Sequence, residues 1–224
     1  MELKEKEIHL LTTISNLRFM STQQIHSIHG YNGKYGANVT RRKLKSLEET
    51  GYLKSWQPSK YDQKVFYLSK KGAEEIALFH GIENMKTVTK SNTTLHQLMV
   101  TEIYVGLRNC NIGKIRRFIL NQLVGVAIAD AFIEYQVGDK NKLIFLEVDR
   151  ATERISIIMD KLKQYQEACE SGWWQVKFGI FPEVCFVTTS DTRKRSLLKL
   201  KEQCQFRVNV MTLDEFTVKP ESII

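Results

Sequence analysis

The stretch NVTRRKLKSLEETGYL, residues 38–53, has the spacing of a helix with one apolar side and one basic side. Thr40, Leu44 and Leu47 recur at i, i+4 and i+7, so they share one side of a helix that Gly51 ends. The other side carries a basic stripe formed by Asn38, Arg41, Arg42 and Lys45. At about 100° per residue, the mean directions of the two sets differ by about 140°. The stretch therefore predicts a helix that packs on one side and exposes the basic stripe on the other.

The residues around this helix fit one small unit. Outward from it, the sequence predicts a helix over residues 3–17, a short helix between Ser21 and Gly30, strands over 52–56 and 64–68, and a helix over 70–79. Ser21 and Gln24 have the spacing of a capping box, and Ser69 is the expected N-cap of the last helix. The two strands and their polar turn predict a hairpin that carries Lys54, Lys60 and Lys64.

This succession of elements, over about residues 5–80, resembles the winged helix-turn-helix domains, and RRKLKSLEETGYL resembles their recognition helix. In those domains the recognition helix enters the major groove of DNA, while the hairpin, or wing, touches the backbone or the minor groove. The resemblance implies that Arg41 and Arg42 read guanine edges and that the three lysines of the hairpin hold phosphates. Two alternatives stay open, a basic helix face that is merely solvated and a winged helix that binds protein.

The positive charge of the chain is concentrated in its first part. The 224 residues carry a net charge of +8. Residues 1–90 hold 15 basic and 9 acidic side chains, a net charge of +6, whereas residues 91–224 have a net charge of +2. A basic region joined to a nearly balanced one predicts that the first region meets a polyanion and that the second has another role.

The sequence predicts no membrane segment and no signal peptide. The longest apolar stretch, residues 123–133, contains Asp130 and is shorter than the ~20 apolar residues that span a bilayer. The N-terminal MELKEKEIHLL lacks the basic and then apolar pattern of a signal peptide. The four cysteines are scattered and have no C-x-x-C spacing, which favours reduced thiols and no zinc site. We therefore expect a cytosolic protein with no membrane partner.

The second part of the chain predicts a separate domain. Residues 83–95 are polar and without periodicity, so we expect them to link a domain at 1–82 to a domain at 96–224. The second domain is predicted to contain a helix over 96–107, strands over 117–124, 128–137 and 143–148, a helix over 152–169, a strand over 184–189, a helix over 192–203 and a strand over 206–211. The expected fold class is a two-domain α+β or α/β protein whose second domain has the order αβββαβαβ.

Three carboxylates lie near the ends of the predicted strands. Glu147 and Asp149 are two residues apart, on one face of a strand and about 7 Å from one another, and Asp130 lies on the preceding strand. Hard divalent cations take oxygen ligands, so these residues are candidates for a catalytic Mg²⁺ or Mn²⁺ site that activates water. The alternative is that the three carboxylates only cap strands or pair with Arg150 and Arg154.

The αβββαβ order with these acids resembles the PD-(D/E)XK nuclease fold, which implies a restriction-endonuclease-like core. The nuclease pattern has Pro before the first acid, where this chain has Ala129, and Lys at the last motif position, where it has Asp149. The missing lysine would position water and offset charge. Lys161 or Lys163, one helix later, is the candidate that replaces it. These departures favour a degenerate site in a protein that is not an enzyme.

Nearly the whole chain resembles the replication-relaxation family of plasmids and other mobile elements from Gram-positive bacteria. The resemblance rests on five segments after the basic region: HQLMVTEIYVGL, IADAFIEY, FLEVDRATER, KLKQYQEA and VCFVTTS. The matching positions are His96, Asp130, Glu147, Asp149, Arg150, Lys161, Leu162 and Tyr165. The resemblance implies a role in plasmid replication, DNA relaxation or transfer, with a plasmid replication protein as a candidate partner. The sequence shows neither the His-x-His motif nor the catalytic-tyrosine cluster that nicking enzymes use.

Three functions are consistent with these observations. The favoured one is a sequence-specific protein for double-stranded DNA, acting in replication or transcription control as a homodimer, because winged-helix readers usually need two half-sites. The alternatives are a metal-dependent DNA nuclease targeted by its winged helix and a winged-helix scaffold for protein contacts. The missing motif lysine argues against the nuclease. The basic stripe with its basic hairpin argues against the protein-binding scaffold.

Overall fold

The computed structural model describes residues 3–83 and 85–224, so residues 1, 2 and 84 of the predicted first domain and linker lie outside the described residues. The chain divides into two compact units, Met1–Val105 and Gly106–Ile224. The division falls inside helix α5 (Thr94–Asn109), after the segment 83–95 that the sequence predicts as a linker. The first part of α5 therefore belongs to the first unit.

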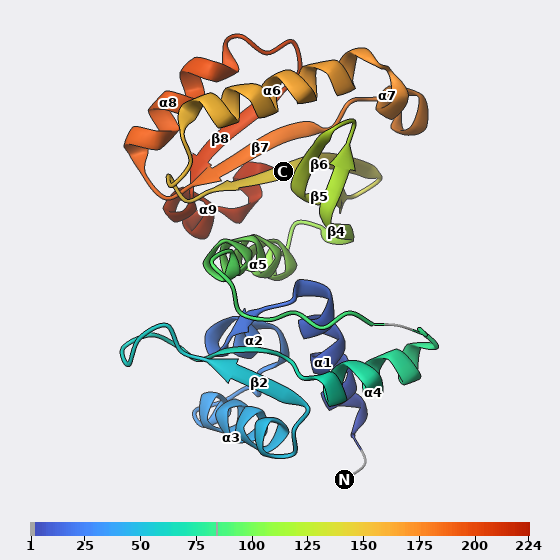
Figure 1. Ribbon diagram of the computed structural model, residues 1–224, viewed down its shortest axis with the longest axis vertical. Helices are drawn as coiled ribbons and strands as arrows, with labels where there is room; N and C mark the ends of the chain where they lie inside the picture. Colours follow the sequence, from blue (N-terminus) through green and yellow to red (C-terminus); the bar gives the residue numbers. More distant parts are fainter. Residues whose placement is uncertain (1–2, 84) are drawn as a thin grey trace. The chain divides into compact units, whose positions relative to one another are not determined.

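The first unit combines helices with a three-stranded antiparallel sheet (Figure 1). Its elements are α1 (Glu5–Leu17), β1 (Met20–Ser21), α2 (Thr22–His29), α3 (Gly36–Glu49), β2 (Leu53–Trp56), β3 (Val65–Leu68), α4 (Lys70–His80) and the first turns of α5. The sheet order is β1-β3-β2, and Phe66 of β3 pairs with both Met20 and Ser55. The strand β1 has no counterpart among the elements predicted for this unit, because two residues are too few to show an alternating pattern, and the sequence places the predicted helix over 96–107 in the second domain.

Local sequence signals determine where α2 and α4 begin. The Ser21 hydroxyl accepts a hydrogen bond from Gln24 N, and the Gln24 side-chain oxygen accepts one from Ser21 N at 2.9 Å, which completes the expected capping box. The Ser69 hydroxyl accepts a hydrogen bond from Gly72 N at 3.0 Å at the start of α4. A Cβ atom at position 72 would lie 2.2 Å from the carbonyl oxygen of Tyr52, so only glycine fits there.

The core of the first unit joins all its helices. Its fully buried apolar side chains include Leu11, Ile14, Leu17, Met20, Ile25, Leu44, Leu47 and Ile76. The start of α5 is tied to this unit by side-chain hydrogen bonds. Thr101 Oγ1 donates to the carbonyl oxygen of Phe19 at 3.0 Å, and Gln24 Nε2 donates to the carbonyl oxygen of Leu98 at 3.0 Å. These bonds explain why the unit extends past the predicted domain limit at residue 82.

The second unit is a mixed α/β fold built on a five-stranded sheet. After the end of α5 come β4 (Lys114–Val124), β5 (Ala127–Val137), β6 (Lys140–Asp149), α6 (Ile155–Glu170), α7 (Trp173–Phe178), β7 (Glu183–Thr188), α8 (Asp191–Lys201), β8 (Val208–Thr212), α9 (Leu213–Val218) and a 3₁₀ turn (Pro220–Ile223). The strand order is β4-β5-β6-β7-β8, antiparallel up to β6 and parallel from β6 to β8. The predicted order αβββαβαβ is present, and the six-residue helices α7 and α9 are additional.

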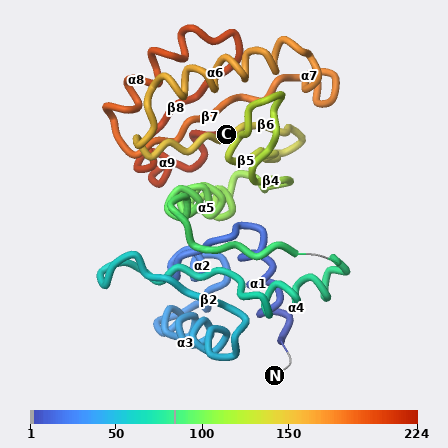
Figure 2. Tube along the Cα trace, in the orientation of Figure 1, coloured from blue at the N-terminus to red at the C-terminus, as the bar shows by residue number. Residues whose placement is uncertain are grey.

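The helices of the second unit cover both faces of this sheet. Figures 1 and 2 show α6 and α8 together on one face and α9 on the opposite face. An aromatic cluster lies under α6. The centre of the Phe145 ring is 4.8 Å from the ring centre of Trp174 and 5.7 Å from that of Tyr165. This packing fixes α6 against β6, and both elements carry candidate site residues.

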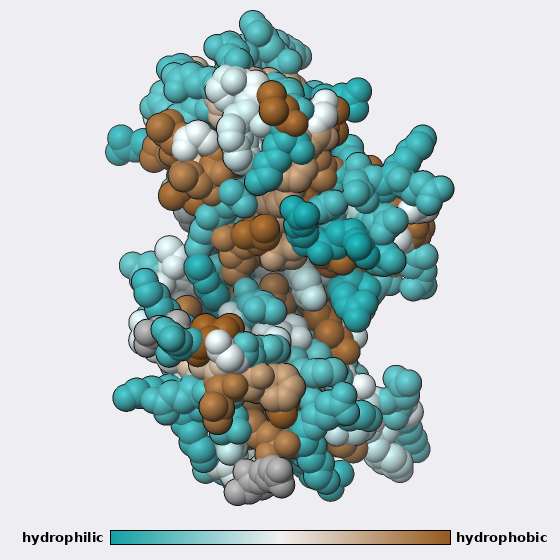
Figure 3. Space-filling view, turned by 90° about the vertical axis from the view of Figure 1, so that its right-hand side faces the viewer, coloured by the Kyte–Doolittle hydropathy of each residue, from teal (hydrophilic) through white to brown (hydrophobic). Residues whose placement is uncertain are grey.

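Apolar side chains also remain exposed on both units, for example Leu78 in the first and Leu123 in the second. The face drawn in Figure 3 shows hydrophobic patches of this kind, separated by hydrophilic surface. Within residues 3–83 and 85–224, no helix combines the length and apolar character needed to cross a membrane.

Candidate functional site

The basic stripe of α3 lies on the exposed side of the helix. Asn38, Arg41, Arg42 and Lys45 are exposed, whereas Thr40, Leu44 and Leu47 are buried in the first unit. Arg41 Nη1 donates a hydrogen bond to Asn38 Oδ1 at 2.9 Å, so these two side chains support one another on the surface. The two opposite sides that the sequence predicts for this helix are therefore both present.

The hairpin of β2 and β3 presents further cations. Lys54, Lys60 and Lys64 are all exposed, and the Lys60 ammonium lies 4.9 Å from the centre of the Tyr61 ring. Arg41, Lys45 and Lys64 line the same groove, so cations of α3 and of the hairpin face one space. A polyanion in that space would meet positive charge from both elements.

A buried polar cluster lies between β6 and α6 in the second unit. Glu147 is almost completely buried, and its Oε2 is 2.5 Å from Lys161 Nζ while its Oε1 accepts a hydrogen bond from Tyr165 Oη at 2.5 Å. Asp130 is adjacent on β5, where the pairing of β5 with β6 ends at Ala131. Beyond that point Asp130 Oδ2 accepts a hydrogen bond from Val148 N at 2.7 Å in place of a backbone acceptor.

The cluster shifts the protonation of its members. Burial, and then the nearby negative charge of Asp130, raise the pKa of Glu147 to about 8, although Lys161 and Tyr165 both act to lower it. Burial alone lowers the pKa of Lys161, but the charges of Glu147 and Asp130 outweigh burial and raise it. Burial also raises the pKa of Tyr165. The cluster therefore combines a buried carboxyl group of raised pKa with a neighbouring cation.

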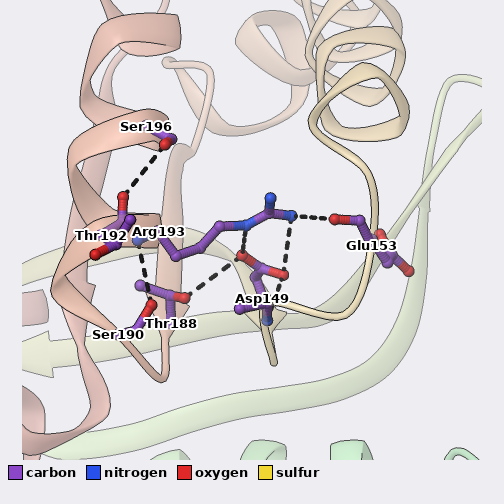
Figure 4. Close-up of polar contacts among 8 residues, drawn as sticks. Asp149, Glu153, Thr188, Ser190, Thr192, Arg193 and Ser196 are labelled. Carbon is purple, nitrogen blue, oxygen red and sulfur yellow. Dashed lines mark hydrogen bonds and ion pairs between the residues drawn. The ribbon is translucent and has the colours of Figure 1, made fainter.

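Asp149 has different partners from Glu147. Arg193 Nε contacts Asp149 Oδ2, and Arg193 Nη2 donates to Asp149 Oδ1 at 3.3 Å (Figure 4). Thr188 Oγ1 donates to Asp149 at 3.4 Å, and the backbone N of Ala151 donates to it at 3.0 Å. Arg193 Nη2 also donates to the carbonyl oxygen of Glu153 at 2.9 Å, which ties the loop before α6 to α8. The cation paired with Asp149 is thus Arg193, whereas the alternative interpretation of the sequence pairs the carboxylates with Arg150 and Arg154.

The three carboxylates predicted to share a metal site are consequently divided. Asp130 and Glu147 lie together, whereas Asp149 is bonded to Arg193. No group of three or more His, Cys, Asp and Glu side chains among the described residues is arranged to hold a metal ion. Mg²⁺ and Mn²⁺ need carboxylate oxygens that are open to the ion, and each Glu147 carboxylate oxygen already has a protein partner. As placed, these side chains do not fit such an ion.

Sequence reasoning found part of this arrangement. The sequence offers Lys161 or Lys163 in place of the motif lysine, with Lys161 as the catalytic candidate. In the structure Lys161 contacts Glu147, whereas Lys163 is exposed and lies 3.1 Å from Asp160. The sequence indicates Tyr165 only as a matching position of the family resemblance. Arg193 was missed, because a residue 44 positions from Asp149 shares no sequence pattern with it.

Comparisons with known proteins bear on the family of this chain. A family model described as replication-relaxation matches residues 11–184. The comparison with curated proteins finds no match. Among solved structures, a restriction endonuclease, FokI, bound to DNA, is similar at 14% sequence identity with a TM-score of 0.39. That similarity covers 100% of this chain and 46% of the FokI chain, so this chain spans less than half of its length. A TM-score this low does not establish a common fold.

Proposed function

This chain belongs to the replication-relaxation family, and we propose that it is a sequence-specific protein for double-stranded DNA, acting in the replication, DNA relaxation or transcription control of a plasmid or other mobile element. The observation that carries the proposal is the basic stripe. Arg41 and Arg42 are exposed on the side of α3 that faces away from the buried Leu44. Exposed arginines on a helix that fits the major groove are the commonest readers of guanine.

The arrangement of the first unit supports assigning it as a winged helix-turn-helix domain. The order α1, β1, α2, α3, β2, β3 and the sheet order β1-β3-β2 are those expected when α3 is the recognition helix and the β2–β3 hairpin is the wing. The exposed lysines Lys54, Lys60 and Lys64 then serve as phosphate contacts. The net charge of +6 in residues 1–90 is consistent with a polyanionic partner.

A homodimer is part of the proposal. One winged helix reads few base pairs, and two copies on half-sites one helical turn apart would supply the affinity that a single copy lacks. Sedimentation of the full chain at micromolar concentration, free and on DNA, tests this. A monomer under both conditions would contradict it.

A metal-dependent nuclease is the second candidate, because one observation favours it. Lys161 lies 2.5 Å from Glu147, where it supplies a cation that the sequence motif lacks at Asp149. Against it, Glu147 and Asp149 are engaged by protein partners. We therefore favour a binding protein whose second unit carries a degenerate nuclease-like site, with a plasmid replication protein as a candidate partner.

One assay separates these functions. The full chain is incubated with supercoiled plasmid, with and without Mg²⁺ or Mn²⁺, and the plasmid is examined for retardation, nicking and relaxation. Retardation without cleavage is the expected result. Nicking that depends on the cation and is lost in Glu147→Gln would establish the nuclease instead. Neither retardation nor cleavage would favour a protein-binding scaffold.

A further inference from the structure

A groove in the first unit lies between the start of α2, the exposed side of α3 and β3. Its volume is about 560 Å³, within the ~300–1,000 Å³ of sites that hold small molecules. Ala37, Leu44 and Phe66 contribute apolar surface to its lining. Leu44 and Phe66 belong to the buried core, with 1% and 3% of their surface exposed, so they form a rigid floor of the groove, and Ala37 supplies the more accessible apolar surface.

The walls of the groove carry an excess of positive charge. Arg41 and Lys45 of α3 line it together with Lys64 of the hairpin. Glu48 is the one carboxylate among its described lining residues, and it already has two partners. Its Oε2 lies 3.3 Å from Lys64 Nζ, and its Oε1 accepts a hydrogen bond from Ser55 Oγ at 2.5 Å. Lys64 and Glu48 offset one another, and Lys45 Nζ lies 3.6 Å from Glu49 Oε1 in an exposed pair. Arg41, which donates a hydrogen bond to the neutral Asn38, is therefore the main cation that faces the groove.

Polar side chains on the α2 wall are held in place. The Thr40 hydroxyl donates to the carbonyl oxygen of Gly36 at 3.1 Å, so the Thr40 oxygen accepts from His26 Nδ1 at 2.9 Å and fixes the imidazole ring. Gln63 Nε2 donates to Gln23 Oε1 at 2.6 Å, and Gln23 N donates to Gln63 Oε1 at 2.8 Å. The groove is therefore bordered by ordered polar groups, which lowers the cost of ordering a ligand.

We propose that this groove is a binding site for a small amphipathic anion, an aromatic carboxylate of one or two rings. The ring system packs against Ala37 and over the groove floor formed by Leu44 and Phe66. The carboxylate meets Arg41, whose planar guanidinium matches its two oxygens, and Lys45. This site goes beyond the proposed function and needs no DNA to be tested.

The probe is 2-naphthoate, and the neutral 2-naphthamide has nearly the same shape without the charge. Both are titrated into the full chain in the absence of DNA, by calorimetry and by amide chemical shifts. We expect 2-naphthoate to shift residues that line the groove and to bind up to about five-fold more tightly than 2-naphthamide, since one partly exposed ion pair contributes up to ~1 kcal/mol. Equal binding of the two probes, shifts elsewhere, or no binding at millimolar probe would overturn the proposal.

Neighbouring arginines on α3 provide the matched variants. Arg41 lines the groove, whereas Arg42 is exposed on the same helix and is absent from the lining. We expect Arg41→Ala to weaken 2-naphthoate binding about five-fold and Arg42→Ala to leave it within two-fold. Equal losses would show general attraction by the basic unit and would overturn a specific site. Ala37→Phe fills the groove without changing charge and should abolish binding, with thermal unfolding confirming that this variant folds. Undiminished binding in folded Ala37→Phe would also overturn the proposal.

Discussion

Arg193, in the first turn of α8, contacts both carboxylate oxygens of Asp149, the last residue of β6. Both side chains are nearly buried, and the same guanidinium also reaches the carbonyl oxygen of Glu153 in the loop before α6. The pair therefore connects β6, α8 and the loop that leads to Lys161 and Tyr165.

The first prediction concerns the stability that this pair contributes. Arg193→Ala leaves the buried Asp149 carboxylate without its cation, so we expect the free energy of unfolding to fall by about 3–5 kcal/mol. Arg195→Ala, on the exposed surface of the same helix, should change it by less than ~0.5 kcal/mol. Urea unfolding followed by circular dichroism measures both. Coincident unfolding curves for the two variants would show that the pair does not stabilise the fold.

The second prediction concerns the pH dependence of stability. The pKa of Glu147 is raised from 4.5 to about 8 in the folded chain, so between these values the folded state holds a proton that the unfolded state has released. The Glu147 contribution to stability therefore falls as the pH rises from about 5 to about 8. Replacing Glu147 with Gln removes this dependence, so Glu147→Gln should show a shallower decline than the native chain over that window.

Urea unfolding at several pH values measures the slope, and Glu170→Gln, at an exposed position near the end of α6, is the matched control. The control should keep the native slope. Parallel pH profiles for native chain and Glu147→Gln would contradict the raised pKa.

Sequence patterns predict those features in which the interacting residues are close along the chain. The two sides of α3 follow from i, i+4 spacing, and the capping box of α2 follows from Ser21 and Gln24. The strands β5 and β6 follow from apolar runs. Whether Lys161 or Lys163 reaches Glu147 depends on how α6 is rotated about its axis relative to the sheet. Packing determines that rotation. The Arg193–Asp149 pair depends on the parallel pairing of β6 with β7, the strand that leads into α8. No local sequence pattern encodes that pairing.

The third prediction concerns the limit of the first unit. A fragment that ends at residue 82 lacks the start of α5, and with it the bonds from Thr101 to Phe19 and from Gln24 to Leu98. We expect a fragment of residues 1–109 to unfold cooperatively and at higher temperature than a fragment of residues 1–82. Circular dichroism melting of the two fragments is the measurement. If both melt at the same temperature, α5 is dispensable for this unit and the predicted limit at residue 82 stands.

The last prediction tests the roles of individual cations in DNA binding. A specific duplex is first selected from a random library with the full chain, and binding to it and to a random duplex is then titrated at several salt concentrations. Affinity should fall steeply with salt, because Lys and Arg displace counterions from the phosphates.

Arg41→Ala and Arg42→Ala should each weaken the selected duplex by about 1–3 kcal/mol and the random duplex less, because a base-edge contact is lost. Lys60→Ala, on the exposed hairpin, should weaken both duplexes alike. Equal losses on both duplexes for the arginine variants would reassign Arg41 and Arg42 as phosphate contacts, and binding that is insensitive to salt would contradict an electrostatic interface altogether.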